Sequence, residues 1–189
     1  IPELFEKEID AFSFEKAADF VSETFHQAME SIKEMGLEDG STLCLSFVCQ
    51  NESKKKKIVT AHLGDARAMI VRSDGKSREL TIDHKPSMRS EFDRVHKDFG
   101  MVTRDNRIDG VLAVARSLGD FNIHGVGREP EINEFEVDEN DKLLVICCDG
   151  VFDVLTNDDV AKIALNASSA TEAAYTIRNA AFGALSYDN

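Results

Sequence analysis

The sequence predicts an α+β fold with mostly antiparallel strands. Strand-like apolar runs cluster in the middle of the chain and are joined by tight turns, whereas the long amphipathic segments lie towards the two ends. The regular strand–helix alternation that is typical of a parallel sheet is not seen. The chain has 189 residues, of which 42% are hydrophobic and 30% are charged. Residues 1–189 are therefore expected to form a single globular domain.

The N-terminal third predicts one helix followed by two strands. Residues 14–35 carry apolar side chains at helical spacing, and Ser13 is placed to cap this helix. Strands are expected over residues 42–48 and 58–71. The loop between them, residues 51–57, contains four consecutive lysines, for which a solvated turn is expected and a binding role is the alternative.

The middle of the chain predicts further short elements. A strand is expected to end near Leu80, and residues 111–114 and 131–137 are further strand candidates. Residues 87–99 predict a helix with three apolar side chains on one face, namely Phe92, Val95 and Phe99.

The last two helices are predicted from their capping residues. Thr156 precedes a helix that is expected to start near Asn157. Ser169 and Glu172 have the spacing of a capping box, and the helix they begin is expected to run to about Leu185. Both signals are local, so they fix where each helix starts.

Residues 143–148 form the most informative run of the chain. Six apolar residues predict a strand that is buried on both faces, and the run ends abruptly at Asp149-Gly150, with Asp153 three residues further on. A carboxylate at the end of a buried strand is costly to desolvate unless a cation compensates its charge, and a divalent metal is one such cation. An ordinary strand-to-turn junction, with Asp149 capping the next helix, is the alternative.

Charge and cysteine content limit the partners and the compartment. The formal net charge of −13 argues against nucleic acid or an anionic membrane as the main partner. No apolar run reaches the ~18 residues of a membrane span. The four cysteines lie in apolar, strand-like runs without zinc-site spacing, at Cys44, Cys49, Cys147 and Cys148. Buried free thiols suit a reducing compartment, so the cytoplasm or the nucleus is expected.

Other aspartates also follow apolar segments beside glycine or asparagine. They are Asp65, Asp120 and Asp188. If these segment ends converge, their carboxylates would build an oxygen-rich site that suits Mg²⁺ or Mn²⁺. Two such ions can activate a water for hydrolysis. Spacing alone does not establish convergence, so the residues by themselves lead only as far as a two-metal hydrolase.

Seven motifs, read in chain order, resemble the metal-dependent serine/threonine protein phosphatases of type 2C. The motifs are Gly40-Ser41-Thr42, residues 61–68 (AHLGDARA), residues 80–86 (LTIDHKP), residues 112–120 (LAVARSLGD), residues 129–132 (EPEI), residues 148–160 (CDGVFDVLTNDDV) and Asp188-Asn189. The resemblance covers residue 40 to the last residue. Any one motif is weak, but seven in the order of the family leave little room for chance.

The resemblance implies a β-sandwich of two mostly antiparallel sheets flanked by helices, in four αββα layers. It implies that Asp149 and Asp188 bind paired Mg²⁺ or Mn²⁺ ions, and that Asp65 and Asp153 hold a further, weaker ion. The implied reaction is attack of a metal-bridging hydroxide on a phosphoserine or phosphothreonine of a protein substrate. No side chain is implied as the nucleophile, and the sequence indicates neither the substrate protein nor the oligomeric state.

The chain also departs from the family pattern. The Asp-Gly-His-Gly-Gly motif and the phosphate-binding arginine before it are absent, so the chain is expected to be N-terminally truncated and to lack the last strand. Ala66, His62 and Phe152 replace the usual serine, asparagine and tryptophan. A catalytically silent module that binds or regulates a partner protein is the alternative function. The enzyme is favoured because both Asp149 and Asp188 are present.

Several remaining polar residues are expected to be structural. His62 is interpreted as a packed or outward-facing imidazole, and residues 83–86 as a turn that Pro86 helps to fix. Arg116 is expected to form an ion pair with an acid such as Asp120, with a phosphate contact as the alternative. Residues 97–108 are interpreted as a flap that contacts the substrate.

Overall fold

The structure, a computed structural model, describes residues 14–188. The chain divides into two compact units. Unit 1 comprises Ile1–Asp65 and Asp83–Glu136, and unit 2 comprises Ala66–Ile82 and Val137–Asn189. The predicted cap at Ser13 and the terminal Asn189 lie outside the described residues. Each unit has its own antiparallel sheet and its own apolar core.

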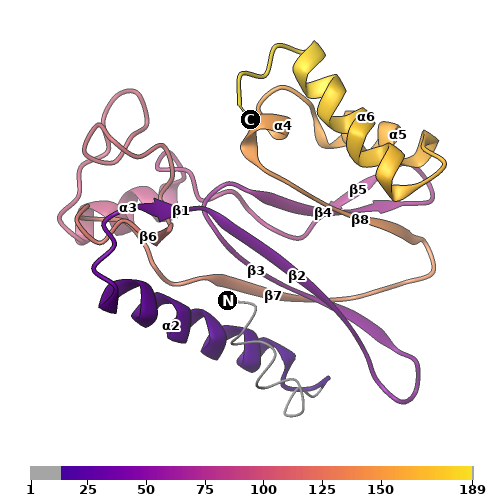
Figure 1. The fold of residues 1–189 in the computed structure, drawn as a ribbon, viewed down its shortest axis with the longest axis horizontal. Coiled ribbons are helices and arrows are strands. Elements are labelled where there is room, and N and C mark those ends of the chain that lie inside the picture. Colours follow the sequence, from indigo (N-terminus) through magenta and orange to yellow (C-terminus); the bar gives the residue numbers. More distant parts are fainter. Residues whose placement is uncertain (1–13, 189) are drawn as a thin grey trace. The chain divides into compact units, whose positions relative to one another are not determined.

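Unit 1 is built on a three-stranded antiparallel sheet with the order β2-β3-β7. Its strands are β2 (Leu43–Gln50), β3 (Lys56–Leu63) and β7 (Glu131–Glu136). Helix α2 (Ala17–Glu34) lies along this sheet in Figure 1 and shares a core with it. The buried residues of that core are Ala17, Val21, Phe25, Met29, Cys49, Val59, Ala61 and Leu63. The predicted first helix is therefore confirmed.

The rest of unit 1 surrounds a shorter helix. Helix α3 (Arg89–Lys97) contributes Val95 to a small core with Ile108 and Val126. The two-residue strands β1 (Gly40–Ser41) and β6 (Leu118–Gly119) pair antiparallel. Gly119 has φ +110, and a Cβ there would lie 2.4 Å from the carbonyl oxygen of Asp39, so only glycine suits this pairing.

Unit 2 consists of a second three-stranded antiparallel sheet and three helices (Figure 1). The sheet order is β5-β4-β8, and its strands are β5 (Ser77–Glu79), β4 (Arg67–Arg72) and β8 (Asp141–Cys147). The helices are α4 (Asp149–Phe152), α5 (Asn157–Asn166) and α6 (Ala170–Gly183). Sheet and helices share one core, whose buried members are Met69, Val71, Val160, Ala161, Ala164, Ala173 and Ile177.

The two predicted helix starts are confirmed. The Thr156 hydroxyl accepts the backbone N–H of Asp159, and the Asp159 carboxylate accepts the backbone N–H of Thr156, which completes a capping box. At α6, the Ser169 hydroxyl accepts the backbone N–H of Glu172. The Glu172 carboxylate binds Ser168 rather than Ser169, so the reciprocal half of the predicted box is shifted by one residue.

The prediction of one strand over residues 58–71 is wrong. The segment forms two strands, β3 and β4, which are separated at Gly64 and Asp65. Gly64 has φ +94, a conformation that L side chains rarely adopt, and it breaks the extended backbone. Apolar runs lie on both sides of Gly64 and Asp65, and the segment was read as one strand although its pattern is interrupted there.

Three further predictions are corrected. Residues 111–114 form no strand and make only an isolated bridge between Leu112 and Ile108. Helix α3 ends at Lys97, and Phe99 lies beyond it with φ +63 and 92% of its surface exposed. β8 is not buried on both faces, because Ile146 is 42% exposed and the strand has one described neighbour, β4.

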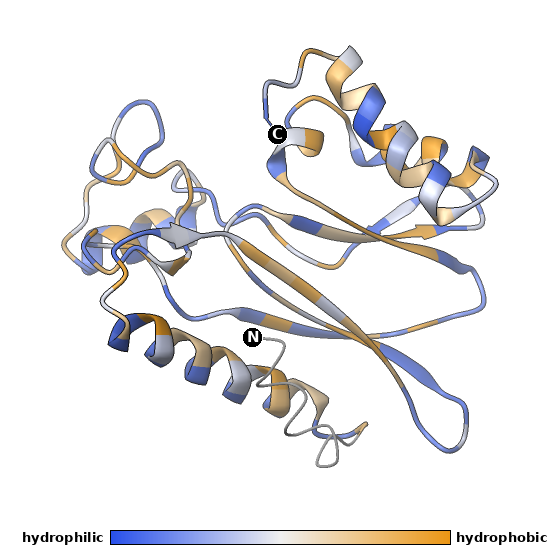
Figure 2. Cartoon of the chain, in the orientation of Figure 1, coloured by the Kyte–Doolittle hydropathy of each residue, from blue (hydrophilic) through white to orange (hydrophobic). Residues whose placement is uncertain are grey.

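The β2–β3 hairpin carries the lysine-rich loop. Figure 2 shows the hairpin tip as a hydrophilic segment. Lys54–Lys56 are exposed, as expected for a solvated turn, but Lys57 is buried and its Nζ lies 2.7 Å from Oε1 of Glu134.

Within residues 14–188, the helices are too short or too polar to cross a membrane.

Candidate metal centre

Unit 2 brings Asp149 and Asp188 together from distant parts of the sequence. β8 ends at Cys147, Cys148 takes the N-cap position of the short helix α4, and Asp149 is the first residue of that helix. Asp188 follows α6. The ligand atoms of Cys148, Asp149 and Asp188 all lie within 4.8 Å of one another. The two carboxylates therefore converge, and their role as metal ligands stays a prediction.

Gly150 explains why the two segments approach so closely. A Cβ at Gly150 would lie 2.6 Å from both Cβ and Oδ2 of Asp188, which is closer than real Cβ contacts. The Asp-Gly sequence thus supplies a carboxylate and, beside it, the space for a second one. The glycine serves this close approach and does not form a turn with positive φ.

The thiol of Cys148 borders the same carboxylates. Its Sγ lies 3.5 Å from Oδ2 of Asp188, a distance at which the S–H donates to the carboxylate. Burial raises the pKa of the Cys148 thiol, and the neighbouring Asp188 and Asp149 carboxylates raise it further. The thiol therefore stays protonated at neutral pH and acts as a weak hydrogen-bond donor.

The donor set of this cluster fits a hard divalent cation. Asp149 is half-buried and Asp188 is exposed, so their oxygens can be reached from solvent. Mg²⁺ typically takes one or two protein carboxylates and keeps several waters, and Mn²⁺ favours similar oxygen ligands. The ligand atoms of the two carboxylates lie within 4.8 Å of each other, close enough to share such an ion.

Asp153 lies one helical turn beyond Asp149, and its backbone N–H donates to the Asp149 carbonyl at 2.7 Å. Its side chain is exposed and lines an open pocket of about 510 Å³ together with Arg67, Phe152 and Asn157. The Arg67 guanidinium donates to Asn157 at 2.7 Å and lies over the Phe152 ring at 4.5 Å. Among the described residues, Asp153 does not join the cluster of Cys148, Asp149 and Asp188.

Asp65 belongs to unit 1 and is only 3% exposed. It forms an ion pair with Lys85. The backbone next to it is fixed by two hydrogen bonds between Gly64 and His84: the Gly64 N–H donates to Nδ1 of His84 at 3.2 Å, and the His84 N–H donates to the Gly64 carbonyl at 2.9 Å. Gly64 also packs against Thr42, where a Cβ would lie 2.4 Å from Cγ2. The role of Asp65 as a metal ligand stays a prediction.

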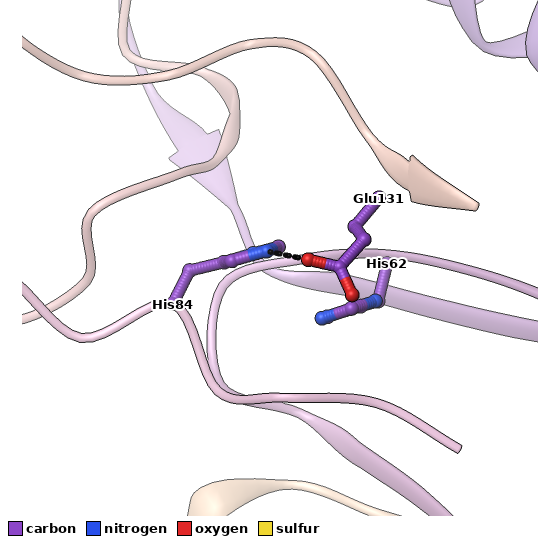
Figure 3. Close-up of side chains that lie close together, drawn as sticks. All are labelled: His62, His84 and Glu131. Carbon is purple, nitrogen blue, oxygen red and sulfur yellow. Dashed lines mark hydrogen bonds and ion pairs between the residues drawn. The ribbon is translucent and has the colours of Figure 1, made fainter. Parts of the chain in front are cut away.

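Unit 1 holds a second group of potential ligands, His62, His84 and Glu131 (Figure 3). The two imidazole rings are stacked, with centroids 4.4 Å apart and planes 3° from parallel. Nε2 of His84 faces Oε2 of Glu131 at 3.4 Å. Because the lone pair of an imidazole nitrogen lies in the ring plane, two stacked rings cannot both direct a lone pair at one ion. The group is a packed polar cluster, which confirms His62 as a packed imidazole.

The protonation of His84 follows from its contacts. Burial lowers the pKa of His84 to about 4, and the nearby Arg116 charge lowers it as well. The imidazole is therefore neutral at pH 7. Since Nδ1 accepts the Gly64 N–H, the ring proton is on Nε2 and points to Glu131. The sequence did not indicate this cluster, because its members come from three separate segments.

Arg116 forms a structural ion pair, but with Glu91 and not with Asp120 as predicted. Its Nε lies 3.0 Å from Oε1 of Glu91, and Arg94 approaches the other oxygen of Glu91 at 2.9 Å. Burial alone would raise the pKa of Glu91, but the hydrogen bonds from Arg116 and the charge of Arg94 lower it overall. Arg116 also donates to the Glu129 carbonyl, so it fixes the local backbone.

The chain is similar in sequence to one group of enzymes over almost its entire length. The sequence model of the family described as "Protein phosphatase 2C" matches residues 2–189. Protein phosphatase 2C homolog 1 of Schizosaccharomyces pombe is 34% identical in an alignment of 176 residues that covers 90% of this chain and 50% of that protein. The chain belongs to the protein phosphatase 2C family. The resemblance seen in the seven motifs is thereby confirmed.

Solved structures share the fold of this phosphatase 2C chain. A sex-determining protein of C. elegans has a TM-score of 0.81 at 23% identity, over 99% of this chain and 48% of that one. A serine-threonine phosphatase 2C of Toxoplasma gondii has a TM-score of 0.75 at 20% identity, over 96% of this chain and 71% of that one. These likenesses confirm the predicted α+β, phosphatase 2C-like fold.

The chain spans half or less of the length of the curated relatives it matches first. It covers 50% of the S. pombe protein and 40% of Probable protein phosphatase 2C 76 of Arabidopsis thaliana, which is 32% identical over 176 residues. The activity and the substrates of the whole protein are therefore matters of proposal.

Proposed function

We propose that this chain forms part of a metal-dependent protein serine/threonine phosphatase. The observation that carries the proposal is the meeting of Asp149 and Asp188 beside Gly150 in a chain of the phosphatase 2C family. Each feature alone has a structural explanation. Together they describe a pair of carboxylates that the fold holds close, at the positions where the family resemblance expects metal ligands.

In this proposal Asp149 and Asp188 hold two Mg²⁺ or Mn²⁺ ions, and Asp65 and Asp153 serve a third, weaker ion. The paired ions would supply an activated water at neutral pH and positive charge for the phosphoryl oxygens. The residues of the chain itself bind and orient. Asp149 is fixed as the first residue of α4, and the Cys148 thiol donates to Asp188 and holds that carboxylate in place.

The proposed substrate is a protein that carries phosphoserine or phosphothreonine. The proposal gives no side chain the role of nucleophile, so the protein contributes positioning and charge rather than a covalent intermediate. A reducing compartment, cytoplasm or nucleus, is proposed for the same protein. The expectation behind it was buried free thiols, and of the four cysteines only Cys49 is buried, whereas Cys148 is exposed.

The test uses the full-length protein that contains these residues and a phosphothreonine peptide. We expect hydrolysis that depends on Mn²⁺ and is abolished by EDTA. Asp149→Asn should lower kcat/KM by at least ~100-fold, in line with loss of a metal ligand. Asp19→Asn is the matched control, because Asp19 is an exposed carboxylate on α2.

Two outcomes would contradict the proposal in different ways. Hydrolysis that persists in EDTA would exclude the metal mechanism. A folded full-length protein that neither binds Mn²⁺ nor hydrolyses the peptide would instead favour the silent regulatory module.

A further inference from the structure

The carboxylate of Asp65 already has a cation of its own. Asp65 is 3% exposed and forms an ion pair with Lys85, whose side chain is 33% exposed. A buried carboxylate requires a compensating positive charge, because desolvation disfavours its ionised form. Lys85 supplies this positive charge within unit 1.

Lys85 is held beside Asp65 by its own turn. The Lys85 N–H donates to the Asp83 carbonyl at 3.0 Å, and the Lys85 carbonyl accepts the Met88 N–H at 3.0 Å. The two hydrogen bonds between Gly64 and His84 tie the preceding residues of both segments together. The backbone hydrogen bonds thus hold Asp65 and Lys85 next to each other.

A divalent ion and the Lys85 ammonium need the same carboxylate. A hard cation binds a carboxylate oxygen at about 2.0–2.6 Å, depending on the metal. An ammonium group at hydrogen-bond distance from the same carboxylate repels that cation. The exposed part of Lys85 gives it a route away from Asp65 into solvent. An ion can therefore occupy this position only after Lys85 has withdrawn.

We propose that Lys85 competes with a divalent cation for Asp65, and that this competition sets the metal concentration at which the position fills. The inference rests on the proposed function, since it takes Asp65 as a metal ligand. Lys85 is a positioning residue in this account. It acts through Asp65, whose carboxylate it neutralises in the metal-free protein.

The experiment is a Mn²⁺ titration of the full-length protein, followed by electron paramagnetic resonance of free Mn²⁺. We expect a tight class of sites that requires Asp149 and Asp188, and a weak class that Asp65→Asn removes. Lys85→Gln keeps a hydrogen-bond donor but removes the charge, and it should tighten the weak class about 10-fold or more. Lys85→Arg keeps the positive charge beside Asp65 and should therefore not tighten the weak class.

The matched control is Lys33→Gln, because Lys33 is an exposed lysine of the same unit. It should leave both classes of site unchanged. In the double variant Asp65→Asn/Lys85→Gln, the gain from removing Lys85 should vanish, because the carboxylate it competes for is gone. A second readout is the rise in melting temperature on adding Mn²⁺, which should be larger for Lys85→Gln than for the wild type.

The outcomes separate this inference from the proposed function. If the wild type has no tight class of Mn²⁺ sites, the proposed phosphatase function is wrong. Two results would overturn the inference and leave the proposed phosphatase intact. In both, the tight class of Mn²⁺ sites is present. In the first, Lys85→Gln does not change the affinity of the weak class, and in the second, neither protein has a weak class. A gain that persists in the double variant would do the same. If Lys85→Gln does not fold, Lys85→Met takes its place in the same titration.

Discussion

Acidification from pH 6.5 to about 4 should destabilise unit 1 through His84. The folded protein holds the pKa of His84 at about 4, against an ordinary value of 6.5, mainly because the ring is buried. His84 is 2% exposed, so solvent screens this effect little. The shift corresponds to roughly 3 kcal/mol, at about 1.36 kcal/mol per pH unit of difference.

The sign follows from which state binds the proton first. Above pH 6.5 this imidazole is neutral in the folded and unfolded states, and the stability does not depend on it. Between pH 6.5 and about 4 the unfolded chain binds the proton and the folded protein does not. The free energy of unfolding therefore falls as the pH falls through this range, and no further loss from His84 follows below it.

The assay is urea unfolding of the wild type and of His84→Gln at several pH values from 7.5 to 4.5. Glutamine can accept the Gly64 N–H but does not titrate. The wild type should lose about 1.4 kcal/mol more per pH unit than the variant between pH 6 and 4.5. His26, whose pKa is raised chiefly by a hydrogen bond to the Ser22 carbonyl, works in the opposite direction but is common to both proteins. Parallel pH profiles for the two proteins would refute the reasoning.

Two glycine substitutions give further predictions. Gly150→Ala should weaken Mn²⁺ binding in the tight class at least ~10-fold, because its Cβ would displace Asp188, whereas Gly183→Ala on α6 meets no atom within 4 Å and should leave binding unchanged. An unaltered Mn²⁺ affinity in Gly150→Ala would count against the site. Phe99→Gly should raise the free energy of unfolding by about 0.5–1 kcal/mol, since relief of the left-handed backbone exceeds the entropy cost of glycine and an exposed ring loses little burial. The control Asn106→Gly, at φ +59, should gain less free energy of unfolding, because asparagine tolerates this conformation. If chemical denaturation shows equal gains for both variants, or a loss for Phe99→Gly, the backbone at Phe99 is not strained.

Local signals gave the most accurate structural predictions. The start of α5 was predicted from Thr156 as a capping residue, because an N-cap is satisfied within the first turn of its helix. Strand predictions depended on partners elsewhere in the chain. Residues 111–114 have the composition of a strand, yet they make only one bridge, since pairing needs a neighbouring strand that the sequence does not specify.

The partners of charged residues were also hard to predict from the sequence. Arg116 was expected to form an ion pair with an acid such as Asp120, and the fold places Glu91 against that guanidinium. The ion pair of Asp65 and Lys85 was not predicted either, because the two residues lie 20 positions apart in the sequence. The meeting of Asp149 and Asp188 was expected only through the family resemblance, because spacing does not determine where the end of a strand and the end of a helix come together.

The two kinds of carboxylate in this chain predict different affinities for the proposed metal ions. Asp65 and Asp149 both follow a strand and lie beside a glycine, so their sequence contexts look alike. Asp65 is buried and neutralised by Lys85, whereas Asp149 is half-buried and lies close to a second carboxylate, Asp188. Neighbouring negative charges favour a divalent ion, and a resident ammonium opposes it. Burial and the charge of the nearest neighbour, rather than the Asp and Gly letters, therefore predict a tight position at Asp149 and a weak one at Asp65.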